Sequence, residues 1–151
     1  MPKPAKEKKS ASKKQDRQEL QEKYLELQVL KQQISNYVEQ KQAVDAKINE
    51  LNASIEALKA LPNVKKGEEM WSSLGSGTFV RSDIKDVEKV LVAIGAGVVT
   101  KETLPKAIEI LESRVKEFSD INDEIIRQAN TMVERINQLE PEVEEFAEQE
   151  N

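Results

Sequence analysis

Cysteine and histidine are both absent from the 151 residues of this chain. Without cysteine there is no disulfide and no thiol nucleophile, and without either residue the common zinc sites are excluded. The absence of histidine also excludes a Ser-His-Asp triad and a histidine general base. No other group of residues supplies a base, a nucleophile and an oxyanion donor, so we expect no enzyme activity, no cofactor and no metal site.

Aromatic residues are scarce at 4%, whereas charged residues make up 34% of the chain. This balance leaves little bulk for a compact core, but it suits long helices with narrow apolar seams. The net charge of −5 provides no chain-wide attraction to nucleic acid. No run of about 18 apolar residues occurs, so we expect no transmembrane helix. The missing cysteines favour a reducing compartment, and we expect a cytoplasmic protein.

Glycine is also rare, and four of the five glycines fall in one short stretch. They form two copies of an apolar residue, Gly-x-Gly and a β-prone pair, beginning at Leu74 and at Ile94. Glycine permits positive φ, so each Gly-x-Gly is typical of a tight turn or bulge between strands. Neither copy completes a phosphate-binding motif. We therefore predict two β-hairpins in series within residues 68–101, with strands over residues 69–73, 77–82, 88–94 and 98–101.

A heptad repeat precedes these hairpins. With Leu20 at position a, apolar residues fill the a and d positions through Leu58, except for Lys23 and Lys41. A strict seven-residue repeat of this length predicts a coiled-coil helix over residues 18–61. Pro62 is expected to end that helix.

A second heptad repeat follows the hairpins and predicts a helix over residues 103–146. Thr103 is a suitable N-cap, and Pro105 lies in the first turn, where its missing N–H costs nothing. Asn122 is the only polar residue of this seam. Pro141 is expected to kink or end the helix.

The two heptad stripes have the same length, 38 residue steps each. If the chain folds back at the hairpins, pairing residues whose numbers sum to 166 brings every a position against a d position. Leu27 then meets Leu139, and the large Tyr37 faces the small Ala129, as a packed seam requires. The predicted fold is α+β: a long antiparallel coiled-coil hairpin with two β-hairpins inserted between its helices. The open strand edges predict that the β part forms a barrel with other subunits.

Both ends of the chain are highly charged. Residues 1–17 contain seven Lys or Arg and no large apolar residue after Met1. They predict a basic disordered tail, with an electrostatic arm for RNA or an acidic partner as the alternative. Residues 147–151 are predicted to be an acidic tail. The acidic residues from Glu140 to Glu150 lack the spacing of a calcium loop, so we expect them to be solvated rather than to bind a metal ion.

The order helix, two hairpins, helix, with Leu-Gly-Ser-Gly-Thr-Phe-Val at 74–80 and Ile-Gly-Ala-Gly-Val-Val at 94–99, resembles the alpha-class subunit of prefoldin. The resemblance covers about residues 18–146. It implies a complex of two alpha-class and four beta-class subunits, built as a double β-barrel with six coiled-coil arms. It further implies that this complex holds unfolded client proteins without ATP and passes them to a group II chaperonin.

Two sets of candidate functional residues follow. The first set lies near the free ends of the helices, where apolar side chains either form the last coiled-coil layers or grip exposed apolar segments of clients; it comprises Leu20, Tyr24, Leu25, Leu27, Leu139, Val143 and Phe146. The second set lies in the hairpins and is expected to carry subunit assembly; it comprises Leu74, Gly75, Gly77, Phe79, Val80, Val90, Val92, Ile94, Gly95, Gly97, Val98 and Val99.

Three classes of function compete for this sequence. A chaperone subunit that holds unfolded proteins is favoured, with beta-class prefoldin subunits, unfolded clients and a group II chaperonin as partners. An RNA- or ribosome-associated coiled-coil protein is the alternative suggested by the basic tail, and a passive coiled-coil scaffold is the third. The acidic net charge makes nucleic acid the less favoured partner, and no membrane partner is expected.

Overall fold

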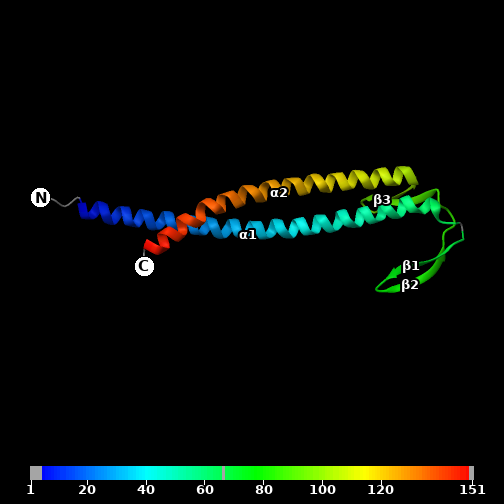
Figure 1. Cartoon of the computed structure of the whole chain (residues 1–151), viewed down its shortest axis with the longest axis horizontal. Coiled ribbons are helices and arrows are strands. Elements are labelled where there is room, and N and C mark those ends of the chain that lie inside the picture. The colour runs from blue at the N-terminus through cyan, green and yellow to red at the C-terminus, as the bar shows by residue number, and fades with distance from the viewer. Residues whose placement is uncertain (1–4, 66, 150–151) are drawn as a thin grey trace. The chain divides into compact units, whose positions relative to one another are not determined.

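In the computed structural model, which describes residues 5–65 and 67–149, two long helices flank two β-hairpins along the sequence (Figure 1). The elements are α1 (Ala5–Ala60), the short 3-10 helix η1 (Leu61–Asn63), β1 (Glu69–Gly75), β2 (Thr78–Asp83), β3 (Lys89–Gly95), β4 (Val98–Thr103) and α2 (Leu104–Gln149). This order confirms the predicted α+β fold, and the strands lie within two residues of their predicted bounds. The chain divides into two units: a hairpin unit, Val44–Ile121, and a helical unit, formed by the rest of α1 and α2.

The first helix begins earlier than the sequence predicts. Residues 1–17 are expected to be a disordered tail, but α1 starts at Ala5. Residues 5–60 contain neither glycine nor proline, and Lys, Glu, Gln and Ala are strong helix formers. The side chains from Lys9 to Glu19 are all exposed, so local helix propensity rather than burial accounts for this stretch. Residues 1–4 of the predicted tail lie outside the described residues.

The second helix begins as the sequence predicts. The Thr103 hydroxyl accepts a hydrogen bond from the backbone N–H of Lys106 at 3.4 Å. This bond satisfies one of the donors that the first turn of a helix leaves without an intrahelical partner. Thr103 is therefore the N-cap of α2.

The helix α2 extends to Gln149, beyond the predicted end at residue 146, and Pro141 lies inside it. Of the two effects predicted for this proline, a kink or an end of the helix, the end does not occur there. Beyond Pro141, Val143 packs against a buried cluster, and Glu142 forms an ion pair with Lys23 at 2.9 Å. These contacts with α1 hold the last turns in place although proline removes one backbone hydrogen bond. The predicted acidic tail is therefore helical through residue 149, and its residues 150 and 151 lie outside the described part.

Each β-hairpin forms its own two-stranded antiparallel sheet. In the first, Gly75 pairs with Thr78, which leaves a two-residue loop. The loop residues Ser76 and Gly77 both have positive φ, 51° and 74°, as a type I′ turn requires. Gly75, with φ of 96°, lies at a shift in strand register. Each Gly-x-Gly therefore supplies both a bulge and a turn, since the motif at residues 95–97 repeats this geometry.

The buried residues of the hairpin unit come from both helices and from β3. Val92 of β3 is 6% exposed, and the other buried apolar side chains are Leu51, Ile55, Leu104 and Ala107. The Arg114 guanidinium on α2 donates a hydrogen bond to the backbone carbonyl of Ala93 on β3. The second hairpin is thus fixed to α2 by packing and by a hydrogen bond.

The helical unit has a core of its own. Leu27, Ile136 and Leu139 form a buried cluster, against which Leu30, Ile34 and Val143 pack. Leu27 and Leu139 are partners in the predicted register, as are Leu30 and Ile136. The antiparallel seam predicted from the heptads therefore agrees with the packing in this unit.

Candidate functional sites

The predicted client-binding residues divide into buried and exposed members. Leu27 and Leu139 are 7% and 0% exposed, so both belong to the coiled-coil core. Tyr24 and Leu25 are 50% and 62% exposed, which is high for large apolar side chains. Leu20, Val143 and Phe146 are half-buried. The exposed members are thus the ones available to another molecule.

An apolar groove of about 520 Å³ lies in the helical unit, close to the end of α2. Its walls come from α1 and α2 and are formed by Leu20, Gln21, Tyr24, Leu25, Val143 and Ala147. Four of these residues belong to the predicted set. Gln21 and Ala147 are additions, and no apolar periodicity marks them, because one is polar and the other is small. Phe146, which belongs to the predicted set, does not line the groove.

Ion pairs join α1 and α2 next to this groove. The Arg135 guanidinium binds both carboxylate oxygens of Glu26, at 2.8 and 3.2 Å. This hydrogen bonding lowers the pKa of Glu26 and raises the pKa of Arg135. The hydrogen bond to Glu142 likewise raises the pKa of Lys23. Lys23 is one of the two charged residues that interrupt the predicted seam, and its pairing with Glu142 shows how the seam tolerates it.

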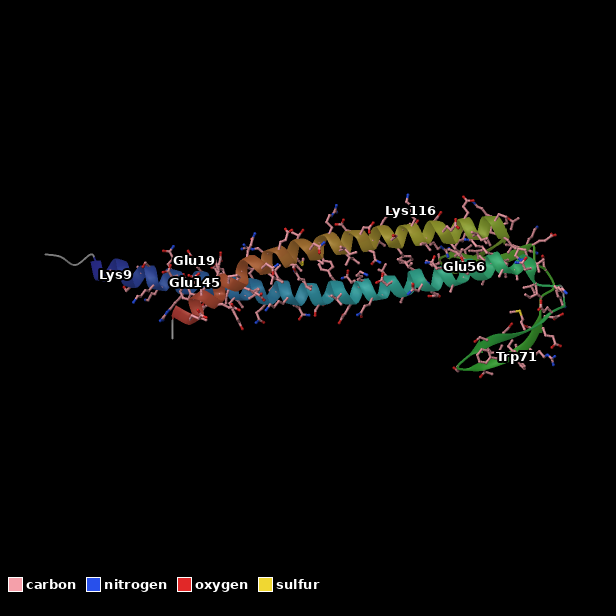
Figure 2. The ribbon with its side chains drawn as sticks, in the orientation of Figure 1. Lys9, Glu19, Glu56, Trp71, Lys116 and Glu145 are labelled. Atoms are coloured by element: carbon pink, nitrogen blue, oxygen red, sulfur yellow. The ribbon has the colours of Figure 1, made fainter. Side chains whose placement is uncertain are left out.

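The first hairpin exposes apolar side chains on both of its faces. Trp71, Leu74 and Phe79 are 68%, 67% and 57% exposed, and Met70 and Val80 are also exposed. Figure 2 shows the Trp71 side chain on the β1–β2 hairpin. Side chains alternate between the faces of a strand, so Trp71 and its neighbour Met70 point to opposite sides. Three of the predicted assembly residues, Leu74, Phe79 and Val80, belong to this surface.

The second hairpin has one buried and one exposed face. Val92 and the half-buried Val90 point toward the helices, whereas Leu91 is 72% exposed. The remaining predicted assembly residues of this hairpin, Ile94, Val98 and Val99, are also exposed. Val92 is therefore part of the chain's own core, separate from the surface set. Sequence reasoning missed Leu91, although an unbroken apolar run such as Val90–Ile94 is typical of a strand buried on both faces.

Neither a metal-binding cluster nor a membrane-spanning helix is found in the part of the chain that the structure describes. No cluster of His, Cys, Asp or Glu there has the arrangement of a metal site. No described helix carries an apolar stretch long enough to cross a membrane.

Comparison with known proteins agrees with this architecture. The family model described as prefoldin subunit matches residues 30–149. A prefoldin subunit alpha from Thermofilum pendens is 30% identical over 129 residues, which cover 85% of this chain and 98% of the relative. A prefoldin subunit alpha from Archaeoglobus fulgidus is 28% identical over 123 residues, covering 80% of this chain and 90% of the relative.

Solved structures show the same fold. A chain in the cryo-EM structure of filamentous PFD from Methanocaldococcus jannaschii superposes with a TM-score of 0.69 at 20% identity, over 76% of this chain and 94% of that chain. The prefoldin beta subunit from Thermococcus strain KS-1 superposes with a TM-score of 0.54 at 17% identity, over 84% of this chain and 90% of that chain.

Fold and sequence together define a chaperone subunit of the helix–hairpin–hairpin–helix type. The chain belongs to the prefoldin family, and the relatives described above identify it with the alpha class. The resemblance carried by the two Gly-x-Gly motifs is thereby confirmed.

Proposed function

We propose that this chain is a subunit of an ATP-independent chaperone that captures unfolded proteins at the ends of its helices and delivers them to a group II chaperonin. The observation that carries the proposal is the groove of about 520 Å³, lined mainly by apolar side chains and bordered by the exposed Tyr24 and Leu25. In a family of chaperones, such a groove suits exposed apolar segments, which are the feature that unfolded proteins share.

Capture by this groove needs no chemical step. Burial of apolar surface contributes about 25 cal/mol for each Å² removed from water. A small groove removes only a small apolar area of the client from water. A single arm is therefore expected to bind weakly. Several arms linked in one complex raise the effective concentration of binding sites, so that weak contacts combine into stable retention. This requirement ties the proposed capture to assembly.

The hairpins are the proposed site of that assembly. Each sheet has two strands, so all four strands in the described chain have one edge without a partner strand. Open edges and exposed apolar faces such as those of Trp71 and Leu91 are satisfied together when strands of other subunits pair with them. We infer that the partners are beta-class prefoldin subunits and that two alpha-class chains join four beta-class chains. A cytoplasmic location belongs to the same proposal.

The direct test mixes the complex of this chain and its beta-class partner with a client that aggregates on dilution from denaturant. We expect near-stoichiometric suppression of light scattering, equal with and without ATP, and recovery of native client only after a group II chaperonin and ATP are added. Aggregation at the same rate as in buffer would contradict the proposal. A requirement for ATP during suppression would contradict the ATP-independent mechanism.

A second candidate function rests on the first turns of α1. Lys9, Lys13 and Lys14 are exposed and form no ion pair with any residue that the structure describes. Such charges bind nucleic-acid phosphates with an affinity that falls steeply with salt. Salt-sensitive RNA binding that is lost on deletion of residues 1–14 would favour this function. Client protection that survives the same deletion would show that the two functions are separate.

A further inference from the structure

The coiled coil of the helical unit has two flanks, one on each side of its seam. With Leu20 and Leu27 at position a, Lys31 occupies position e of α1 and Glu140 occupies position e of α2. Their ion pair of 3.0 Å shows that the e positions of the two helices face each other. The Glu26–Arg135 pair shows the same for the g positions. We call these sides the e flank and the g flank.

The g flank is closed by polar contacts between the helices. Arg135 binds Glu26 through two hydrogen bonds. Two turns earlier on α2, the side-chain carbonyl of Gln128 accepts a hydrogen bond from the hydroxyl of the seam residue Tyr37. A flank whose polar groups are already paired offers little to a further partner.

The e flank carries apolar side chains instead. Tyr24 and Val38 on α1 are 50% and 51% exposed, and Val133 on α2 is 42% exposed. The register of the Lys31–Glu140 pair places Val38 opposite Val133, and it places Tyr24 opposite Ala147. Two apolar layers therefore lie on this flank, one on each side of a single ion pair. The first of them, Tyr24 with Ala147, is a wall of the apolar groove.

The border of the e flank is polar and almost uncharged. The b positions next to it are Gln21, Gln28 and Ser35 on α1, and Asn130, Asn137 and Glu144 on α2, so Glu144 is the one charged residue among them. All six are exposed, and the Gln28 amide donates a hydrogen bond to the Tyr24 hydroxyl at 3.0 Å. The centres of protein–protein interfaces are depleted of charge in the same way, whereas a nucleic-acid surface requires Lys or Arg. The e flank therefore has the composition of a surface that binds polypeptide.

We propose that the e flank binds one amphipathic helix of a non-native client, which packs as a third helix along α1 and α2. The inference rests on the client capture proposed above and names the class of segment that is captured. Successive layers of the e flank are seven residues apart, or about 10.5 Å along a helix, which is the heptad spacing of a partner helix. An extended strand repeats its side chains about every 6.6 Å and would lose this match.

The flank also sets the length of the preferred segment and the position of a polar residue within it. From Tyr24 to Val38 is 14 residues, or about 21 Å of helix, so roughly four turns of the client suffice. The Lys31–Glu140 ion pair lies midway, so a polar residue at the centre of the client's apolar face keeps these charges hydrogen-bonded. The preferred client segment is thus a short amphipathic helix with a polar residue at mid-length.

Fluorescence anisotropy with labelled peptides of about 18 residues tests the inference on the full-length chain. The first peptide is an amphipathic helix with glutamine at the centre of its apolar face, and the second has the same composition in an order without heptad periodicity. We expect the periodic peptide to bind at least about tenfold more tightly, because only it presents all its apolar side chains on one face. Equal affinities would overturn the proposal.

Variants locate the site. The double variant Val38→Lys and Val133→Lys places charge in the apolar layer furthest from the groove, and we expect it to weaken binding of the periodic peptide about tenfold. The matched control is Val29→Lys, because Val29 is 55% exposed but lies at position c, away from the e flank. Equal weakening by the control, or none by the double variant, would contradict the assignment.

The same variants separate this inference from the function on which it rests. If the complex with wild-type chain protects a client but the double variant protects it equally well and binds the peptide normally, capture stands and the third-helix inference fails. If the wild-type complex protects no client, the proposed function fails regardless of peptide binding. Circular dichroism of each variant checks that the helices are retained.

Discussion

The hairpin unit and the helical unit both expose apolar side chains, but they differ in whether their backbone N–H and C=O groups have hydrogen-bond partners. In a helix every interior N–H and C=O is paired within the same segment. In the hairpins one edge of every strand is left with backbone groups that only water or another strand can pair. The apolar surface around Trp71 and Leu91 therefore lies beside backbone groups that form directional hydrogen bonds with another strand, whereas the surface around Tyr24 and Leu25 does not.

This difference explains why one region suits a fixed partner and the other a variable one. Pairing of strand edges specifies direction and register, so it favours a particular subunit in one geometry. Contact with an apolar groove on helices uses side chains alone, so the proposed capture allows segments of many sequences that share an apolar face. If this difference holds, substitutions in the hairpins change assembly, and substitutions at the groove change capture.

Aspartate at Val92 and at Val98 distinguishes the core of the hairpin unit from its surface. Val92 is 6% exposed, so Val92→Asp buries an unpaired charge and is expected to lower the free energy of unfolding by on the order of 3–5 kcal/mol. Val98 is 50% exposed in the single chain, so Val98→Asp is expected to leave the chain folded but dissociate the complex. Thermal unfolding and sedimentation measure the two effects, and an intact complex with Val98→Asp would place the interface elsewhere.

Replacement of Pro141 tests whether capture needs a frayed helix end. Pro141→Ala restores a backbone hydrogen bond and is expected to stabilise the last turns of α2 by up to about 3 kcal/mol. Amide exchange of residues 142–149 should slow accordingly. The groove is already formed when α2 is helical through its last turns, so we expect client protection not to change. A variant with slower exchange and reduced protection would show instead that clients bind the unwound end.

The turn between β3 and β4 offers two neighbouring substitutions that are expected to change stability in opposite directions. Gly97 has φ of 74°, and a Cβ there would meet no atom within 4 Å, so the penalty of Gly97→Ala is conformational rather than steric. We expect a loss of about 1 kcal/mol. Ala96 has φ of 52°, so Ala96→Gly relieves the same kind of strain and should stabilise the hairpin or leave it unchanged. Loss of stability in both variants would contradict the turn geometry.

The smallest effect concerns the Glu26–Arg135 pair of the g flank. Hydrogen bonds from Arg135 lower the pKa of Glu26, so the contribution of this pair to stability is present above the ordinary pKa of glutamate. It disappears as the pH falls through the lowered pKa. Arg135→Gln should return the Glu26 carboxyl to a normal titration, observable by NMR. An unchanged titration would show that another group sets this pKa.

The sequence predicts the frame of the molecule well, because helices and tight turns depend on local patterns. The heptads from Leu20 and Leu104 and the two Gly-x-Gly motifs lead to the correct elements, and the N-cap at Thr103 is confirmed. The sequence places the start of α1 too late, because residues 5–17 contain no large apolar side chain that could be buried. Its helix propensity and its freedom from glycine and proline are the better guide here.

The candidate sites are less predictable, since they depend on which side of an element a residue faces in three dimensions. Tyr24 and Leu25 are predicted as apolar residues that lie off the heptad seam. The sequence gives no sign that Ala147 completes the groove, because the role of a small residue follows from what lies opposite it. Alternation along β3 likewise groups Val92 with the assembly surface. The position of the helices then shows Val92 as buried and Leu91 as exposed.

Mass and client protection, measured in the same preparation of one variant, show whether assembly and capture are separate. Tyr24→Lys combined with Leu25→Lys places charges at the groove without touching the hairpins or the buried cluster. Separation of capture from assembly predicts a complex of unchanged mass that no longer suppresses client aggregation, while Val29→Lys retains both properties. Full protection by the double variant at unchanged mass would contradict the claim that the groove captures clients.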